Sequence, residues 1–207
     1  MKIALTGGIG SGKSHVCKCL AERGISIYDC DKAAKRLMRT SEAIRRELTE
    51  LIGDDAYGDG GGRLNKAAVA AFLLRSADNN QRINAIVHPA VARDFACSGM
   101  QWMECAILFE SGFDKLVDVK ICVTAPERTR IERIMSRDGL TEDKAREWIA
   151  RQLPQESVAS MCDYVIVNDG EADIGGQIDR ILNDINGHRK HCQMSGSNVA
   201  KMPHRHA

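Results

Sequence analysis

One short segment near the N-terminus limits what this chain can fold into more than any other feature of the sequence. Residues 7–14 read Gly-Gly-Ile-Gly-Ser-Gly-Lys-Ser and match the phosphate-binding pattern G-x-x-x-x-G-K-[ST]. The apolar residues 2–6 before it predict a buried strand, and residues 12–22 after it predict a helix. In this context glycines turn backbone N–H groups toward phosphate oxygens, and the helix N-terminus favours an anion.

The same loop provides side chains for a nucleoside triphosphate and its metal ion. Lys13 is placed to reach the β- and γ-phosphates, and the Ser14 hydroxyl is placed to ligate Mg²⁺. We therefore expect ATP and Mg²⁺ to bind here. The residues expected to contact the nucleotide are Gly8, Ile9, Gly10, Ser11, Gly12, Lys13, Ser14 and His15.

Apolar runs alternate with helical segments along the rest of the chain. Four further strands are predicted, at residues 25–28, 102–109, 117–124 and 164–167. Strands separated by helices are typical of an α/β protein with a parallel sheet and right-handed crossovers. The fold class predicted is thus a five-stranded parallel sheet flanked by helices.

The spacing of the strands also predicts the domain organisation. The helical stretch at residues 31–98 is too long for a simple crossover, so we predict an inserted helical subdomain there. Residues 188–207 are polar, contain four basic residues and no acid, and lack periodicity, which predicts a disordered tail. The remainder is predicted to be one domain, residues 1–187, with its core at 1–30, 99–132 and 156–187 and a lid at 133–155.

Composition excludes several classes of protein. Lys plus Arg is 29 against 28 for Asp plus Glu, and aromatic residues are 4%, which argues against a nucleic-acid-binding surface. No apolar run approaches the roughly 18–20 residues of a membrane span. The eight cysteines lack Cys-x-x-Cys spacing and are predicted to be buried free thiols. We expect a cytoplasmic protein that acts on a small molecule as a monomer or weak homo-oligomer.

Two acids beyond the second strand suggest how an acceptor would be used. Asp29 and Asp31 should lie at the same edge of the sheet as the phosphate-binding loop. Carboxylates there can hold Mg²⁺ and accept a proton from an incoming hydroxyl, as a small-molecule kinase requires. Asp31 alternatively only caps the helix that begins near Lys32. A GTPase is disfavoured because Asn65-Lys66 lacks the following Asp of the base-reading motif.

Several segments taken together resemble the dephospho-CoA kinase family. The loop is followed by Asp29-Cys30-Asp31, where the family usually has Asp-Ala-Asp. Three later segments, 83–89, 107–112 and 163–170, agree with the family in order and spacing. The similarity extends over about residues 2–186. It implies ATP-dependent phosphorylation of the ribose 3′-hydroxyl of dephospho-CoA, the last step of coenzyme A synthesis.

The resemblance also implies roles for individual residues. Asp31 would be the general base, and Arg137 with Asp138 resembles the entry to the family's lid. His88 and Glu110 would line the acceptor pocket, and Asn168 would border the adenine of ATP. Each of these last three has a structural alternative: a helix start before Ala90 for His88, a turn for Glu110 and a strand end for Asn168.

From the residues themselves we expect Asp29 to join Ser14 at the metal. We also expect an arginine of the lid to bind the phosphates, with Arg137 favoured over Arg133 and Arg151.

The chain departs from the family pattern at a few positions. His15 stands where the family usually has Thr, Lys66 replaces a usual Arg, Ala106 replaces a usual Pro, and Val158 falls where Lys is frequent. Two other functions stay open. One is another small-molecule kinase such as shikimate kinase, and the other is an ATP-binding regulatory module that has lost catalysis.

Overall fold

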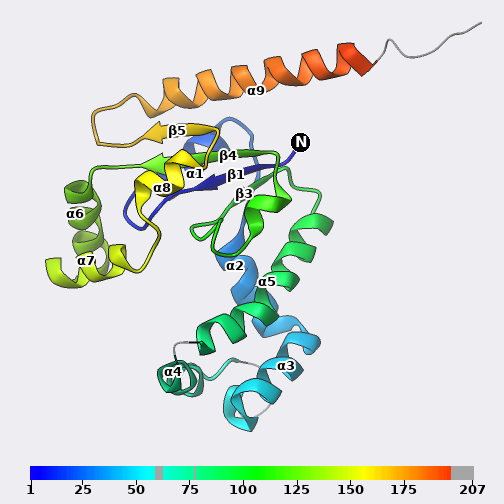
Figure 1. The fold of residues 1–207 in the computed structure, drawn as a ribbon, viewed down its shortest axis with the longest axis vertical. Helices are drawn as coiled ribbons and strands as arrows, with labels where there is room; N and C mark the ends of the chain where they lie inside the picture. The colour runs from blue at the N-terminus through cyan, green and yellow to red at the C-terminus, as the bar shows by residue number, and fades with distance from the viewer. Residues whose placement is uncertain (59–62, 77, 197–207) are drawn as a thin grey trace, which may run out of the picture.

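A sheet of five parallel strands forms the centre of the protein (Figure 1). The computed structural model describes residues 1–58, 63–76 and 78–196. The sheet order is β2-β3-β1-β4-β5, so β1 is central and its carboxyl end opens at the middle of one edge. The predicted five-stranded parallel sheet is confirmed. Its strands are β1 (Ile3–Thr6), β2 (Ile27–Asp29), β3 (Trp102–Glu104), β4 (Val119–Thr124) and β5 (Tyr164–Val167).

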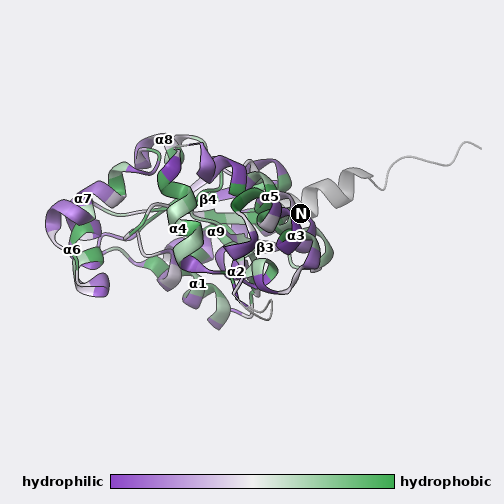
Figure 2. Ribbon diagram, turned by 90° about the horizontal axis from the view of Figure 1, so that it is seen from below, coloured by the Kyte–Doolittle hydropathy of each residue, from purple (hydrophilic) through white to green (hydrophobic). Residues whose placement is uncertain are grey.

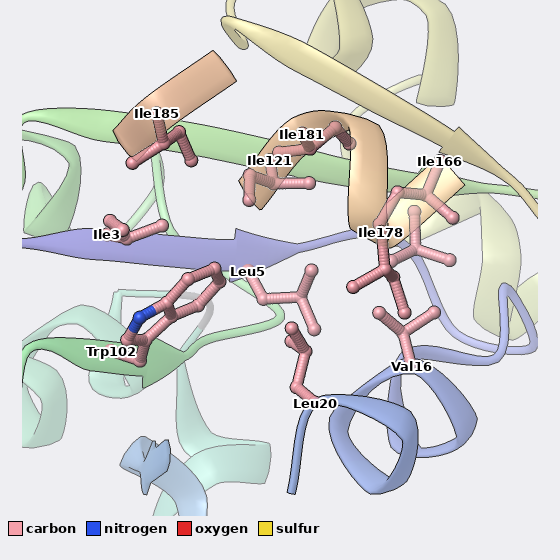
Figure 3. Packing of buried hydrophobic residues seen from close by; sticks show 11 residues of the cluster. Ile3, Leu5, Val16, Leu20, Trp102, Ile121, Ile166, Ile178, Ile181 and Ile185 are labelled. Carbon is pink, nitrogen blue, oxygen red and sulfur yellow. The ribbon is translucent and has the colours of Figure 1, made fainter. Parts of the chain in front are cut away.

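The two faces of the sheet bury different helices because successive side chains of a strand point to opposite sides. On one face, Ile3 and Leu5 of β1 pack with α1 (Lys13–Glu22) and α9 (Ile174–Gly196), as Figure 3 shows. On the other face, Ala4 packs near Phe95 of α5 (Asn79–Cys97). A large apolar side chain that is fully buried contributes about 1.5–3 kcal/mol. Packing on both faces therefore stabilises the sheet, and the sheet positions the loop.

The insertion extends away from the sheet as a small helical unit, in the lower part of Figure 1. It has its own core, in which Ile44, Leu48 and Tyr57 are buried and the Tyr57 hydroxyl donates to the Met38 carbonyl at 2.8 Å. The helical character predicted for residues 31–98 is confirmed. Its helices are α2 (Cys30–Thr40), α3 (Glu42–Ile52), a 3₁₀ turn (Asp54–Ala56), α4 (Lys66–Arg75) and α5.

Two short helices that follow β4 form the region predicted to be the lid. These are α6 (Glu127–Asp138) and α7 (Glu142–Ala150), followed by α8 (Gln155–Ser160). Ile131 and Ile134 of α6 pack against Ala145 of α7. Hydrophobic and hydrophilic turns alternate along both helices in Figure 2, as expected when one side packs and the other meets water.

The predicted third strand is too long. β3 ends at Glu104, and the apolar residues after it form turns in which Ser111 N–H donates to the Ile107 carbonyl at 2.9 Å. Leu108 is fully buried within these turns. The residues after Glu104 are apolar because they are buried. Compact turns packed against the sheet bury them as well as a strand would.

The last helix of the structure, α9, extends into the segment predicted to be a disordered tail. It continues to Gly196, nine residues past the predicted domain end at residue 187. Ile178, Ile181 and Ile185 anchor this helix on the sheet, and once a helix is nucleated each further residue adds a hydrogen bond at little cost. The rest of the predicted tail, residues 197–207, lies outside the described residues.

Two further sequence predictions concern membranes and cysteines. In the described ranges, no helix is both long and apolar enough to cross a membrane. Seven cysteines are free thiols, and the predicted burial is confirmed for Cys30, Cys105 and Cys122. Cys97 is exposed, and the side chain of Cys192 lies outside the described part.

Candidate active site

A cavity of about 970 Å³ opens where β1, β2 and β3 end. We call it the main cleft. It lies between the phosphate-binding loop, the start of α2 and the side of α6, because all three follow strands that end at this edge of the sheet. Nine of the predicted site residues line it, namely Gly8, Ile9, Gly10, Gly12, Lys13, Ser14, Asp29, Asp31 and Arg137.

Gly7, Gly10 and Gly12 of the loop all have positive φ, and the last two show why glycine is needed. Gly10 has φ of +79°, and a Cβ there would lie 2.6 Å from the Arg130 carbonyl oxygen. Gly12 has φ of +90°, and its Cβ would collide with the Asn168 side-chain nitrogen. The loop backbone is therefore packed directly against α6 and the end of β5, leaving no room for larger residues.

The lysine of the loop is held by protein oxygens in this structure. Lys13 Nζ donates to the Gly7 carbonyl at 2.6 Å and lies 3.7 Å from Glu104 Oε1. Burial raises the pKa of the Glu104 carboxyl, and the nearby Lys13 ammonium only partly offsets it. Both side chains line the main cleft, so Lys13 is positioned to contact an anion there.

Three side chains behind the loop fix its shape. Arg130 Nε donates to the Ile9 carbonyl at 2.9 Å, and Gln152 Oε1 accepts from Ile9 N–H at 2.7 Å. Arg133 donates to the Gly10 and Ser11 carbonyls, each at 3.3 Å. These contacts connect the lid helices to the loop. A movement of α6 or α7 would therefore displace the backbone of the phosphate-binding loop.

Asn168 is buried behind the same loop. Its side-chain nitrogen donates to the Ser11 carbonyl at 2.9 Å, and its oxygen accepts from Arg133 at 3.2 Å. It also lines a second cavity of about 480 Å³ together with Gly12, His15 and Gly170. Gly12 and Arg133 line both cavities, so the second adjoins the main cleft.

The two acids at the junction of β2 and α2 have different environments. Asp29 caps α2 by accepting from Lys32 N–H at 2.8 Å, and its carboxylate lies 3.0 Å from the Lys32 ammonium. Burial raises the pKa of Asp29, but these Lys32 contacts outweigh it and leave the pKa below its ordinary value. The helix cap considered for Asp31 is thus supplied by Asp29. Asp31 is exposed on the first turn of α2, in the wall of the main cleft.

The predicted lid cation also reaches the main cleft. Arg137 lines the main cleft and forms an ion pair with Asp138, in which Nη2 lies 2.7 Å from Oδ2. Arg133, one turn earlier on α6, lies closer to the loop because it bonds the loop carbonyls directly. Arg151, at the far end of the lid, pairs with Glu147.

Two predicted acceptor residues lie elsewhere. Among the described residues that line the main cleft, neither His88 nor Glu110 is present. His88 lies inside α5, half-buried with its ring edge-on to Phe113 at 5.5 Å, and burial lowers its pKa. Glu110 is exposed in the turns after β3. Pro89 and Ala90 lie within α5, so no helix starts there.

Sequence reasoning missed Arg130, Gln152 and Glu104. A usable signal existed for the first, because Arg130, Arg133 and Arg137 recur at intervals of three and four and therefore share one face of a helix. Glu104 was the one acid inside the predicted strand at 102–109. For Gln152 the sequence holds no comparable signal, since a lone glutamine near a helix end has no preferred partner.

The parallel sheet, the glycine-rich loop at its central strand and the helical lid define a P-loop nucleotide-binding protein of the small-kinase type. A family model for dephospho-CoA kinases matches residues 1–173. The chain is 39% identical over 194 residues to the dephospho-CoA kinase of Porphyromonas gingivalis, covering 88% of this chain and 93% of the relative. It is 37% identical over 185 residues to that of Bacteroides fragilis, covering 86% and 89%. This chain belongs to the dephospho-CoA kinase family.

Solved structures agree on the fold. A protein from Thermus thermophilus superposes with a TM-score of 0.74 at 27% identity, covering 91% of this chain and 97% of that one. The dephospho-CoA kinase from Campylobacter jejuni gives a TM-score of 0.63 at 18% identity, covering 91% and 100%. Shikimate kinase from Acinetobacter baumannii shares the fold at a lower TM-score of 0.52 and 18% identity, covering 90% and 93%.

Proposed function

We propose that this protein transfers the γ-phosphoryl group of ATP to the ribose 3′-hydroxyl of dephospho-CoA and so completes coenzyme A. The observation that carries the proposal is that Asp31 faces the same cleft as Lys13 and Ser14. Asp29 caps α2 in its place, which leaves the Asp31 carboxylate available to a substrate. Membership of the dephospho-CoA kinase family supplies the identity of that substrate.

In this reaction Asp31 accepts the proton of the 3′-hydroxyl as that oxygen attacks the γ-phosphorus. Lys13 neutralises charge on the transferred phosphoryl oxygens, with Arg137 added from the lid when the lid closes. Arg133 and Asn168 act through the loop, because they hold its carbonyl groups in place. Most of the acceleration in phosphoryl transfer comes from such positioning and electrostatics.

The donor groups in the main cleft fit Mg²⁺. Ser14, Asp29 and Glu104 offer the oxygen atoms that this ion prefers. Across the described ranges no group of three or more His, Cys, Asp or Glu is arranged to hold a metal ion. That suits Mg²⁺, which takes one or two protein oxygens and completes its shell with phosphate and water. We assign Ser14 and Asp29 as its protein ligands; the ion would neutralise charge on the β- and γ-phosphates.

The second cavity is proposed to hold the nucleotide base. It adjoins the loop through Gly12, and His15 and Asn168 are in its wall. His15 follows Ser14 directly, so it lies at the junction between the phosphate-binding loop and this cavity. We also propose that the protein works in the cytoplasm as a monomer or weak homo-oligomer, and buried free thiols are suited to a reducing compartment.

A coupled assay of ADP release tests the function against its alternatives. Purified protein with Mg-ATP is given dephospho-CoA, shikimate or no acceptor. We expect acceptor-dependent ADP release with dephospho-CoA only. Turnover with shikimate would point to another small-molecule kinase, and binding of ATP without turnover in any arm would point to a regulatory module.

A further inference from the structure

The basic side chains of the main cleft differ in whether they are already bound. Four of them have a partner within the described part of the chain: Lys13 with Glu104, Lys32 with Asp29, Arg137 with Asp138, and Arg133 with the loop carbonyls. Lys35 is the remaining one, and among the described residues it has neither a hydrogen bond nor an ion pair. Its ammonium group is exposed in the cleft wall.

Lys35 and Asp31 are neighbours on one face of α2. Residues four apart on a helix have Cβ atoms about 5–6 Å apart and point to the same side. Both residues line the main cleft, which fixes that side as the one facing the ligand. The next basic residue, Arg36, is already paired with Asp94 at 2.6 Å. Asp94 is thus engaged and does not compete for Lys35.

We propose that Lys35 binds the diphosphate group of the acceptor substrate. The proposal rests on the function given above, because dephospho-CoA carries its diphosphate on the 5′ carbon of the same ribose whose 3′-hydroxyl is phosphorylated. A ribose bound with its 3′-oxygen at Asp31 presents its 5′ side about one helical turn away. The Asp31–Lys35 pair matches this arrangement of one reacting hydroxyl and one dianionic group on a single sugar.

The phosphates of ATP are a less suitable partner for Lys35. α2 follows the edge strand β2, whereas the phosphate-binding loop follows β1, and β3 lies between them. Neighbouring strands are about 4.8 Å apart, so the two strand ends are separated by about 10 Å. Lys13 belongs to the phosphate-binding loop and Arg133 bonds its carbonyl groups, so these two cations lie on the ATP side. Lys35 therefore belongs to the acceptor side.

The test compares Lys35→Met, Lys35→Arg and Arg39→Met. Arg39 is an exposed basic residue on the same helix that does not line the main cleft, so its variant is a matched loss of one charge. We expect Lys35→Met to raise the KM for dephospho-CoA about tenfold or more, since a hydrogen bond to a charged group is lost. The KM for ATP should change less than about twofold. Lys35→Arg should retain most of the affinity, and Arg39→Met should behave as wild type.

Adenosine separates diphosphate binding from a general effect of charge. It has the ribose and base of the acceptor but no diphosphate, and its inhibition constant against dephospho-CoA is measured at saturating ATP. We expect this constant to be the same in wild type and Lys35→Met. An equal loss for adenosine and dephospho-CoA, a rise in the KM for ATP alone, or an unchanged KM for dephospho-CoA would each overturn the proposal.

Binding measured by calorimetry keeps the two hypotheses distinguishable. If the wild type binds dephospho-CoA but does not phosphorylate it, the proposed function fails. The role of Lys35 is then still decided by whether Lys35→Met weakens that binding about tenfold. If the wild type does not bind dephospho-CoA at all, both proposals are wrong.

Discussion

Replacing Arg130 with methionine tests whether the lid helices organise the phosphate-binding loop. Arg130 is 5% exposed, its Nε donates to the Ile9 carbonyl, and its guanidinium fills the space beside Gly8. Within the described residues it has no ion-pair partner. Burial lowers its pKa, with Glu127 and Glu156 offsetting part of the effect, yet arginine remains charged. A buried cation without a counter-ion is costly until an anion binds nearby.

Two opposing effects set the expected magnitudes for Arg130→Met. Losing a hydrogen bond from a charged donor costs about 1.5–3 kcal/mol, while removing an unpaired buried charge recovers part of this in the free protein. We therefore expect the free energy of unfolding without ligand to change by less than about 1 kcal/mol. With ATP bound, the loss is not recovered, and since 1.4 kcal/mol is tenfold in Kd, the Kd for Mg-ATP should rise about 10- to 100-fold.

The assay combines urea denaturation of the free protein with calorimetry of Mg-ATP binding. Methionine keeps the aliphatic volume, so packing changes little. Arg128→Met is the control, because Arg128 is exposed on the same helix and pairs only with Glu132. A large loss of stability with an unchanged Kd would refute the argument, since it would make Arg130 a structural residue with no influence on the nucleotide site.

Two other variants test local features of the structure. Gly12→Ala should lower the free energy of unfolding, measured by urea denaturation, by about 2–3 kcal/mol. It forces a left-handed backbone conformation on alanine and displaces the Asn168 side chain from the Ser11 carbonyl. Gly139→Ala, the control, has only the backbone strain and should cost about half as much. Equal losses would contradict this. Asp94 accepts from the Tyr28 hydroxyl and from Arg36, each at 2.6 Å, and the Tyr28 hydrogen bond lowers its pKa. The stabilisation from Asp94 is therefore present above the ordinary pKa of 3.8 and is lost as pH falls through the lowered value. We expect Asp94→Asn to have a lower free energy of unfolding at pH 7. Below pH 3.8 its free energy of unfolding should change less with pH than that of the wild type. Parallel stability curves for the two proteins would show that Asp94 has no such role.

The phosphate-binding loop and the sheet could be predicted because their signals are local. Three apolar residues, Ile3 to Leu5, just before a run of glycines indicate both β1 and the loop, and Lys13 and Ser14 follow at fixed spacing. The parallel sheet places Asp29 and Asp31 at the same edge as the loop, which sequence reasoning anticipated from the rule for parallel sheets. These features need no knowledge of distant contacts.

The parts that could not be predicted depend on which of two equivalent residues makes a contact. Asp29 and Asp31 are both able to cap a helix, and only the backbone geometry at the end of β2 assigns the cap to Asp29. Arg133 and Arg137 are equally basic on one face of α6, and only packing against the loop separates them. The apolar residues after Glu104 satisfy burial as turns, which hydrophobicity alone does not distinguish from a strand.

The role of Asp31 as the proton acceptor is decided by product analysis of wild type and Asp31→Asn. With Mg-ATP and dephospho-CoA, the wild type should form coenzyme A with the new phosphate on the 3′-oxygen, identified by ³¹P NMR. Asp31→Asn keeps the size of the side chain, so it should bind Mg-ATP with wild-type Kd. Its kcat should fall by about 10²- to 10⁴-fold, the usual contribution of a general base. Full turnover by Asp31→Asn, or phosphorylation at another oxygen by the wild type, would contradict the assignment.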